Sequence, residues 1–474
     1  MKRIRLFLAN VGRRKVYYPQ TTPPMGLLYL AAFLRDRFPL DIQVFNQRLS
    51  NCPNETVVRE AIAFEADVIG LGALTPFAHN MRDIAQALRV ALPHALIVLG
   101  GAHPSAAGAA VLQDTVADVA VTGEGELTFE AVLRAHVDGA DFSGIPGLIW
   151  RDRAGEVIVN PGAAPQIEDL DSLPFPAYDL VDMKPYWRIN SAVGVPRRRY
   201  VSLVSSRGCP YHCSWCHQIF GKRFRGHSPE RVVAEIEHFT KRFGVNDIDF
   251  LDDIFNHNLP RFRAILDLLL KKGIKVRIAF PSGLRADILT EDDVKALADA
   301  GTYYAAFALE SGSPRIQQLM GKKLNIPRFL QTVAAAAKHR IFVYGFNILG
   351  FPTETEAEMQ MTIDTACASE LHVASFYLAT PFPNTELYRI AAETRPESLA
   401  NLQFDDMDCA TMHVNVSDMS DDVLFRYQRM ANRRFYSNPR RIVRIIRDYP
   451  QPYFLPMYLP RFISGLTRGL MGSR

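Results

Sequence analysis

Three cysteines in one short segment carry the strongest chemical signal in this chain. Cys209, Cys213 and Cys216 have a C-x3-C-x2-C spacing and follow directly on an apolar, strand-like run. Three thiolates at this spacing can bind three irons of a [4Fe–4S] cluster, which leaves the fourth iron free to bind a substrate. A structural zinc ion would instead need a fourth ligand in a closed tetrahedral site. His212 or His217 could supply that ligand, so zinc stays open as an alternative.

The elements that must position these cysteines begin with an α/β pattern in front of them. Residues 1–140 contain five β-like runs separated by helical runs, at 4–9, 42–45, 68–72, 96–99 and 119–121. Strands that alternate with helices predict a doubly wound, parallel, Rossmann-like sheet with helices on both faces. Ligands of such sheets bind in the loops after the carboxyl ends of the strands. Three of those loops are rich in glycine, which makes this domain a candidate for ligand binding.

A second α/β pattern begins just before the cysteines. Residues 141–198 are rich in proline and aromatic residues and are predicted to be an ordered linker. Six further strand candidates then fall at 200–204, 247–251, 276–280, 304–309, 343–349 and 374–379. Ser228 before Pro229, and Thr290 before three acidic residues, predict the starts of two of the intervening helices. We therefore expect a second α/β domain over 199–392.

The composition excludes several classes of protein. A chain of 474 residues with 48% hydrophobic and 22% charged residues is typical of a globular protein with more than one domain. The formal net charge of +4 is too small to indicate a nucleic-acid partner. No apolar run reaches the roughly 18 residues of a membrane-spanning helix, and the N-terminal apolar stretch is too short for a signal peptide. We therefore expect a cytoplasmic protein without a nucleic-acid partner.

The C-terminal region, residues 393–474, has a different character and is predicted to be mainly helical. Between residues 426 and 474 there are eleven arginines and no lysine or glutamate, and aromatic residues follow from 449 to 462. A basic amphipathic helix followed by aromatic residues is typical of a peripheral contact with a membrane surface, here the inner membrane face. The alternative is that the apolar residues pack on the preceding domain and the arginines are solvated or ion-paired.

The cysteine segment resembles the cluster loop of the radical S-adenosylmethionine (SAM) enzymes, in which an aromatic residue such as Trp215 precedes the third cysteine. The resemblance implies that the second domain is a partial (β/α)6 barrel. It also implies that the open iron chelates the amino and carboxylate groups of SAM. The reduced cluster then cleaves SAM to methionine and a 5′-deoxyadenosyl radical.

Residues at the ends of successive barrel strands match the family's SAM-binding positions. Asp252 and Asp253 suit the SAM ammonium, although surface or helix-capping carboxylates are the alternative. Arg285 suits the SAM carboxylate because a guanidinium can bind it with two hydrogen bonds. The SAM-binding residues that the resemblance implies are Trp215, Asp252, Asp253, Ser282, Arg285, Glu310, Ser311, Gly345 and Gly350.

The first 140 residues resemble the cobalamin-binding domain of one large class of radical SAM enzymes. The matching segments are 23–34, 100–104 and 123–126, whose glycines allow the tight turns and close backbone approach that a corrin ring needs. An ordinary nucleotide or flavin domain, or a degenerate domain without a ligand, is the alternative. The implied cobalamin-binding residues are Met25, Gly26, Leu74, Thr75, Pro76, Phe77, Gly100, Gly101, His103, Gly123, Glu124, Gly125 and Glu126.

One departure from other cobalamin proteins is informative. Many of them use a D-x-H-x-x-G motif whose histidine binds cobalt from below, and none of the twelve histidines here has an aspartate at that spacing. His103 is therefore not expected to be a cobalt ligand. We predict cobalamin bound without a histidine below the cobalt, with Thr75 to Phe77 as the floor of the site.

The two resemblances together imply an enzyme: a cobalamin-dependent radical SAM methyltransferase acting on an unactivated carbon through methylcobalamin. One alternative uses the same cofactors to close a ring or rearrange carbon, as in the anaerobic porphyrin-ester cyclases that this architecture also resembles. Another is a non-catalytic cobalamin- or metal-binding sensor. The expected partners are a small-molecule substrate, hydrophobic if the membrane contact holds, and an electron donor such as flavodoxin or ferredoxin. Neither the substrate nor catalytic residues beyond the cofactor ligands can be read from the sequence.

Overall fold

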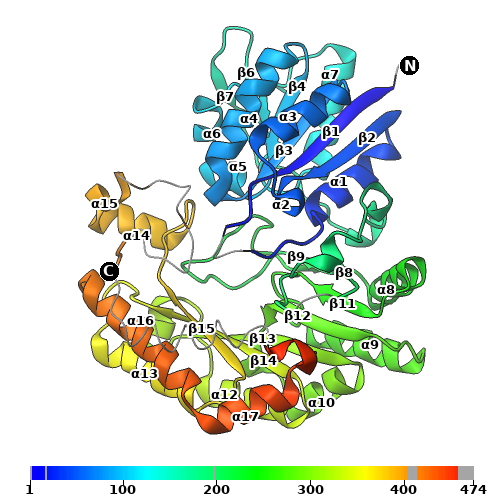
Figure 1. Ribbon diagram of the computed structural model, residues 1–474. Helices are drawn as coiled ribbons and strands as arrows, with labels where there is room; N and C mark the ends of the chain where they lie inside the picture. Colours follow the sequence, from blue (N-terminus) through cyan, green and yellow to red (C-terminus); the bar gives the residue numbers. More distant parts are fainter. Residues whose placement is uncertain are drawn as a thin grey trace.

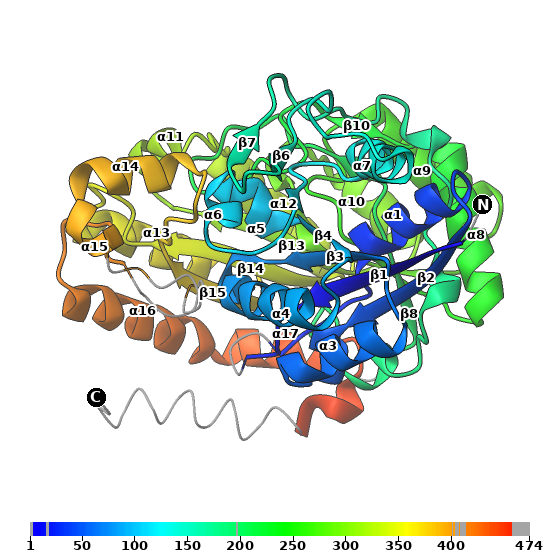
Figure 2. The same cartoon turned by 90° about the horizontal axis from the view of Figure 1, so that it is seen from above.

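The computed structural model describes residues 3–15, 19–195, 198–400, 402, 407 and 414–456. It has two α/β units, each built around its own sheet, and the first unit lies over one end of the second (Figures 1 and 2). The helices of the C-terminal region run along the side of the second unit. The prediction of an α/β fold in two units with a mainly helical C-terminus is therefore confirmed.

The first sheet has the strand order β2-β1-β3-β4-β5-β6-β7. Its first five strands are parallel, and they coincide with the predicted ones to within a few residues. In a sheet of this order the strand sequence reverses between β1 and β3, and ligands bind at that edge. The strands are β1 (Ile4–Val11), β2 (Leu40–Asn46), β3 (Val68–Ala73), β4 (Leu96–Gly100), β5 (Val119–Ala120), β6 (Ile149–Arg151) and β7 (Val157–Val159).

Helices cover both faces of this sheet because its strands are apolar on both sides. In β1, Leu6 and Leu8 belong to the core under α1 and α7, whereas Phe7 and Ala9 belong to the core under α3 and α4. The helical segments are α1 (Met25–Arg35), α2 (Gln47–Ser50), α3 (Asn54–Ala63), the 3-10 turn η1 (Thr75–Phe77), α4 (Ala78–Ala91), α5 (Ala102–Ala107), α6 (Ala110–Gln113) and α7 (Glu126–Asp138).

The linker predicted over 141–198 begins later than expected. Strands β6 and β7 form an antiparallel hairpin on the edge of the first sheet, so this unit extends to residue 159. The hairpin was missed because each strand is short, although the Trp150 indole N–H donates to Asn160 across it at 2.9 Å. Three 3-10 turns follow: η2 (Leu170–Ser172), η3 (Tyr178–Leu180) and η4 (Tyr186–Arg188).

The second sheet is the expected partial barrel. Its six strands are parallel and lie in chain order, so β8 at one edge and β15 at the other do not pair. A short antiparallel hairpin of β9 (Ser206–Arg207) and β10 (Arg225–Gly226) follows the first strand and carries the three cysteines between its arms. The six strands are β8 (Tyr200–Leu203), β11 (Asp247–Phe250), β12 (Arg277–Leu284), β13 (Thr302–Glu310), β14 (Phe342–Leu349) and β15 (Val373–Leu378).

The barrel helices begin where the sequence predicted. The Ser228 hydroxyl accepts a hydrogen bond from the Arg231 amide, and Thr290 forms a capping box with Asp293. The helical segments are α8 (Pro229–Phe243), α9 (Leu259–Lys271), η5 (Ala286–Ile288), α10 (Glu291–Asp299), α11 (Pro314–Leu319), α12 (Ile326–Lys338), α13 (Glu356–Ala368), α14 (Glu386–Thr394) and α15 (Pro396–Ala400).

The C-terminal helices pack on the barrel. Helix α16 (Asp421–Tyr436) contacts β15 and α13, and α17 (Pro439–Asp448) and the turn η7 (Pro452–Phe454) follow it. Several arginines in these helices are ion-paired, as in Arg434–Asp364 and Arg447–Asp448, which is the alternative considered for this region. Residues 457–474 lie outside the described part of the chain. Within that part, no helix is both long and apolar enough to cross a bilayer.

Candidate functional site

A cavity of about 560 Å³ lies between the two units. On one side it is lined by the loops after β3, β4 and β5, which are the ligand-binding edge of the first sheet. On the other side it is lined by the ends of β8, β11 and β12, through Val204, Leu251 and Ser282. Ile219 and Phe220, which follow the third cysteine, close it between the units. One chamber therefore joins the glycine-rich loops to the cysteine loop.

Most of the residues predicted to bind cobalamin line this cavity. Gly101 and Gly123 have φ values of +86° and +69°, a backbone conformation that residues other than glycine rarely adopt. Because these glycines have no Cβ atom, a bulky planar ligand can approach their backbone closely from the cavity. The predicted residues in the lining are Met25, Gly26, Leu74, Gly100, Gly101, Gly123, Glu124, Gly125 and Glu126.

The predicted floor, Thr75 to Phe77, lies just beside the cavity rather than in its lining. Phe77 is buried, the Arg48 guanidinium lies 4.9 Å from the centre of its ring, and Arg48 itself lines the cavity. His103 is buried on α5 and is not part of the lining. No histidine occurs among the described residues that line the cavity. The absence of a histidine below cobalt remains a prediction.

The three cysteines lie on the loop between β9 and β10, and all are half-buried. Burial raises the pKa of all three thiols, and the mutual repulsion of the thiolates helps to raise that of Cys216 to about 12. Three neighbouring thiolates in this setting need a bound cation to stabilise them, which fits an iron–sulfur cluster. No three His, Cys, Asp or Glu side chains in the described chain converge on one point, as a single metal ion would require.

The acidic pair after β11 is divided between two environments. The Asp252 carboxylate is buried and accepts hydrogen bonds from the Ser205 amide and from the hydroxyls of Ser205 and Ser206, at 2.5 to 3.2 Å. It therefore holds the end of β8 in place. Asp253 is partly exposed, with its carboxylate 3.7 Å from His217 beside the third cysteine. Of the two, Asp253 lies beside the cysteine loop, and its contact with SAM stays a prediction.

A second group of charged residues lies beside the cysteine loop. Arg285 stacks 4.0 Å above the Tyr211 ring and donates two hydrogen bonds to Asp287, so its fork is already occupied. Glu310 has a φ of +62° and pairs at 3.1 Å with Lys322, whose ammonium lies 5.9 Å from the Trp215 ring. Lys322 thus lies near both Glu310 and Trp215, and the binding of SAM by these two residues stays a prediction.

The remaining predicted SAM residues differ in their surroundings. Ser282 is exposed in the cavity, whereas Ser311 is fully buried and shares a hydrogen bond with Thr362. Gly345 and Gly350 are pressed against leucines, because a Cβ atom would lie 2.5 Å from Leu371 and 2.9 Å from Leu424 respectively. Packing against Leu371 and Leu424 gives both glycines a structural role, and Gly350 also has a φ of +78°, which favours glycine. Their contact with SAM stays a prediction.

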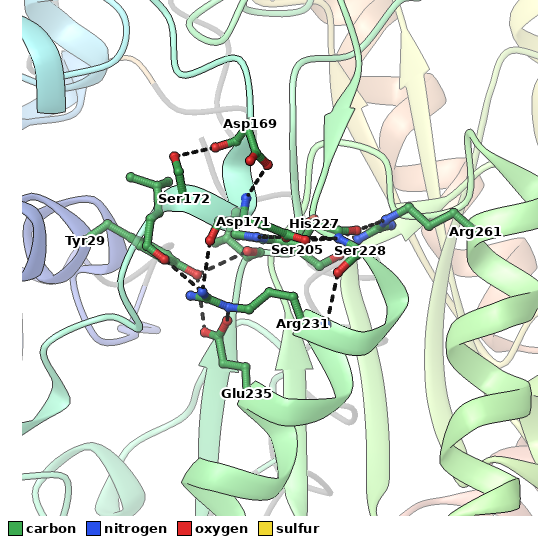
Figure 3. A network of polar contacts seen from close by, with 12 residues as sticks. Tyr29, Asp169, Asp171, Ser172, Ser205, His227, Ser228, Arg231, Glu235 and Arg261 are labelled. Atoms are coloured by element: carbon green, nitrogen blue, oxygen red, sulfur yellow. Dashed lines mark hydrogen bonds and ion pairs between the residues drawn. The ribbon is translucent and has the colours of Figure 1, made fainter.

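Buried arginines and a tyrosine are functional candidates that sequence reasoning missed. Arg207 and Tyr29 both line the cavity. Figure 3 shows Tyr29, from α1 of the first unit, directed at Glu235 of α8, at 3.3 Å. Arg231 joins Glu235 at 3.7 Å and donates to the Leu173 carbonyl of the linker. The first unit, the linker and the barrel are therefore joined by one buried polar network.

Comparison with known proteins agrees with this geometry. A B12 binding domain model matches residues 15–133, and a Radical SAM superfamily model matches residues 203–366. An uncharacterised methyltransferase of Pyrococcus horikoshii is 29% identical over 94% of both chains. The anaerobic magnesium-protoporphyrin IX monomethyl ester cyclase of Cereibacter sphaeroides is 25% identical over 77% of this chain and 60% of its own.

Among solved structures, the radical SAM methyltransferase TsrM of Kitasatospora setae superposes with a TM-score of 0.69. The superposition covers 82% of this chain and 79% of that chain, at 20% identity, and supports the fold. The fold and the shared cavity define a protein with a B12-binding sheet placed over a radical SAM barrel. The chain therefore combines a B12 binding domain with a Radical SAM domain and is similar to cobalamin-dependent radical SAM enzymes, and its cofactors are cobalamin, a [4Fe–4S] cluster and SAM.

Proposed function

We propose that this enzyme transfers a methyl group from SAM, by way of cobalamin, to an unactivated carbon atom of a small molecule. The observation that carries the proposal is the single cavity lined both by the glycine-rich loops of the first sheet and by the barrel-strand ends next to the cysteine loop. A methyl carrier and a radical source that face one chamber can act on the same substrate without its release.

The residues of the chain divide the work of positioning. When bound, SAM and the reduced cluster supply a carbon radical, and cobalamin supplies the methyl group. Cys209, Cys213 and Cys216 would hold the cluster, and Asp253 lies 3.7 Å from His217, the residue after the third cysteine. The walls of the chamber are largely apolar and include Phe129, Phe220 and Leu251. These side chains keep water out of the chamber.

The proposal is tested by anaerobic reconstitution with iron, sulfide and hydroxocobalamin, followed by incubation with SAM and a reductant. A methyltransferase forms both 5′-deoxyadenosine and S-adenosylhomocysteine, because one SAM supplies the radical and another the methyl group. A protein that forms neither, with a full cluster and bound cobalamin, would contradict the proposal and favour a non-catalytic sensor.

Ring closure without net methyl transfer is the second candidate, because a cyclase is among the similar chains. It is less favoured, since the similarity to that protein covers a smaller share of both chains than the similarity to the methyltransferase. Incubation with SAM labelled in its methyl group separates the two. A cyclase would leave the label out of the product and need form only 5′-deoxyadenosine.

Reduction of the cluster requires an electron from outside the chain, for which we propose a small redox protein such as flavodoxin or ferredoxin. A membrane contact through α16 and α17 is not part of the proposal. Arg441 is buried and donates to carbonyl groups in the last turn of α13 and just after it, including those of Cys367 and Leu371. These hydrogen bonds hold helix α17, for which a membrane contact was one of two alternatives, against the barrel.

A further inference from the structure

Four buried charged residues join the cobalamin-binding loop to the base of the cysteine loop. Arg207 pairs with Glu124 at 3.0 Å and with Glu126 at 2.6 Å, and Arg225 pairs with Glu124. Each of the four side chains is at most 7% exposed. We call Glu124, Glu126, Arg207 and Arg225 the charged joint.

The charged joint lies where the two cofactor loops meet. Arg207 and Arg225 are on β9 and β10, the paired arms that close the loop carrying all three cysteines. Glu124 and Glu126 alternate with Gly123 and Gly125, whose backbone lines the cavity. A Cβ atom on Gly123 would lie 3.5 Å from the Ile219 carbonyl, so the two loops also approach each other directly. Movement of one loop therefore cannot leave the other unchanged.

Because the charged joint is buried, each of its charges depends on keeping its partner in place. Removing one member of a buried ion pair leaves an uncompensated charge, whereas an exposed pair can be lost at little cost. Arg207 binds Glu126 through both Nη1 and Nη2, and its Nη1 also donates to Glu124. Glu124 uses separate oxygen atoms for its two arginines. Glu124 also accepts from the Ile167 amide, which adds the linker to the same joint.

We propose that the charged joint couples the two cofactor sites, so that cobalamin in the first unit stabilises the iron–sulfur cluster in the second. Its four members are positioning residues: they fix the loops that hold the cofactors. Coupling of this kind is reciprocal, so the cluster must raise the affinity for cobalamin by the same factor. The inference rests on the cofactor assignments of the proposed function, and not on methyl transfer itself.

The experiment measures iron loss from the reconstituted full-length protein to a ferrous chelator, with and without hydroxocobalamin. We expect cobalamin to slow the loss by about fivefold or more in the wild type, the lower end of common coupling energies. In Glu126→Gln the effect should shrink to less than about twofold. The matched control is Arg223→Gln, since Arg223 lies in the same segment and pairs with Glu168 at an exposed site. This control should keep the wild-type effect.

The reciprocal measurement needs no change in the charged joint. Hydroxocobalamin affinity is compared between the cluster-loaded and the iron-free wild-type protein, and the cluster-loaded protein should bind hydroxocobalamin more tightly, by about fivefold or more. Equal affinities in the two forms would overturn the inference even if Glu126→Gln fails to fold. So would an undiminished cobalamin effect in a folded Glu126→Gln protein. Absence of coupling in a wild-type protein that still forms both SAM products would overturn this inference alone, whereas a wild-type chain that binds no cobalamin would overturn the proposed function as well.

Discussion

Asp252 and Asp253 are neighbours in the sequence, yet their carboxylates have different tasks. The first is saturated with hydrogen bonds from Ser205 and Ser206, and the second faces the cysteine loop beside His217. Successive residues at the end of a strand point in opposite directions, so one carboxylate enters the core while the other reaches the ligand side. The pair is therefore suited to separating structural from binding effects.

We expect Asp253→Asn to lower the affinity for SAM by about tenfold or more, because a hydrogen bond between charged groups is lost. Asp252→Asn should instead lower the melting temperature and leave the SAM affinity of the folded protein within about twofold. Equilibrium binding of SAM to the cluster-loaded protein and thermal melts check both variants. A loss of SAM affinity in Asp252→Asn that equals the loss in Asp253→Asn would contradict this division.

Replacement of one cysteine tests the cluster directly. Cys213→Ala should lose the broad brown absorbance of an iron–sulfur cluster and form no 5′-deoxyadenosine, because two thiolates cannot hold the cube stably. Cys367, which lies on α13 away from the loop, gives the matched control. Iron content near that of the wild type and continued SAM cleavage in Cys213→Ala would show that the assignment is wrong.

Glu235 should make the stability of the protein depend on pH. Burial raises its pKa to about 7, well above the value of an unfolded glutamate. The folded state therefore holds a proton that the unfolded state has released, so stability falls as the pH rises from about 4.5 through about 7. We expect Glu235→Gln to reduce the difference in stability between pH 5.5 and pH 8 by about 2 kcal/mol, because the linkage acts only from pH 5.5 to about 7 in that interval. A variant with the same pH dependence as the wild type would refute this role.

At the scale of residues, the sequence could predict what depends on local spacing. The cysteine triad and the glycine-rich loops were found in this way, and the glycines line the cavity as expected. The charged joint was not predicted because Arg207 and Arg225 lie 83 and 101 residues from Glu124. Nothing in the sequence around an isolated arginine identifies a partner at that distance, although its position next to the cysteine motif was a signal.

At the scale of elements, alternation of strands and helices was predictable, and pairing on the sheet edge was not. Parallel strands such as β3 and β4 have near-continuous apolar runs, which are visible in the sequence. The hairpin of β6 and β7 has only three residues in each strand, too few for a pattern. Helix α17 was recognised as amphipathic, but the sequence could not tell whether a membrane or the barrel covers its apolar face.

Arg441 on α17 tests that last point. Its guanidinium is buried under α13 and donates to several backbone carbonyls, and burial lowers its pKa to about 10. We expect Arg441→Ala to lower the stability by about 2–4 kcal/mol, because those carbonyls lose their charged donor. The exposed neighbour Arg440 is the control, and Arg440→Ala should have little effect.

The same helix should not bind lipid. Sedimentation with liposomes that contain anionic lipid is expected to show no salt-sensitive binding, since Arg434, Arg441 and Arg444 are engaged with the barrel. Salt-sensitive binding that disappears on truncation after Asp422 would restore the membrane contact as a function of this region.

At the scale of the whole molecule, the two units depend on each other for one chamber. A fragment of residues 1–162 contains the complete first sheet, whereas a fragment of residues 1–150 lacks β7 and cuts β6. We expect the longer fragment to melt at the higher temperature, because the contact of Trp150 with Asn160 is kept. Both should bind cobalamin more weakly than the full chain, since the barrel walls of the cavity are missing, as titration by absorbance would show. Equal affinity in fragment and full chain would mean that the barrel contributes nothing to the site.

The position of β7 along the chain has a consequence for how the enzyme is made. Domains at the N-terminus fold first during synthesis. The first sheet is complete at residue 159, and the first cysteine follows only at residue 209. A nascent chain can thus fold the corrin-binding half of its cavity before any of the three cluster cysteines has been synthesised. The oxygen-sensitive iron–sulfur cluster would then be inserted last. Its loop is completed by β10, whose Arg225 pairs with Glu124 of the sheet that has already folded.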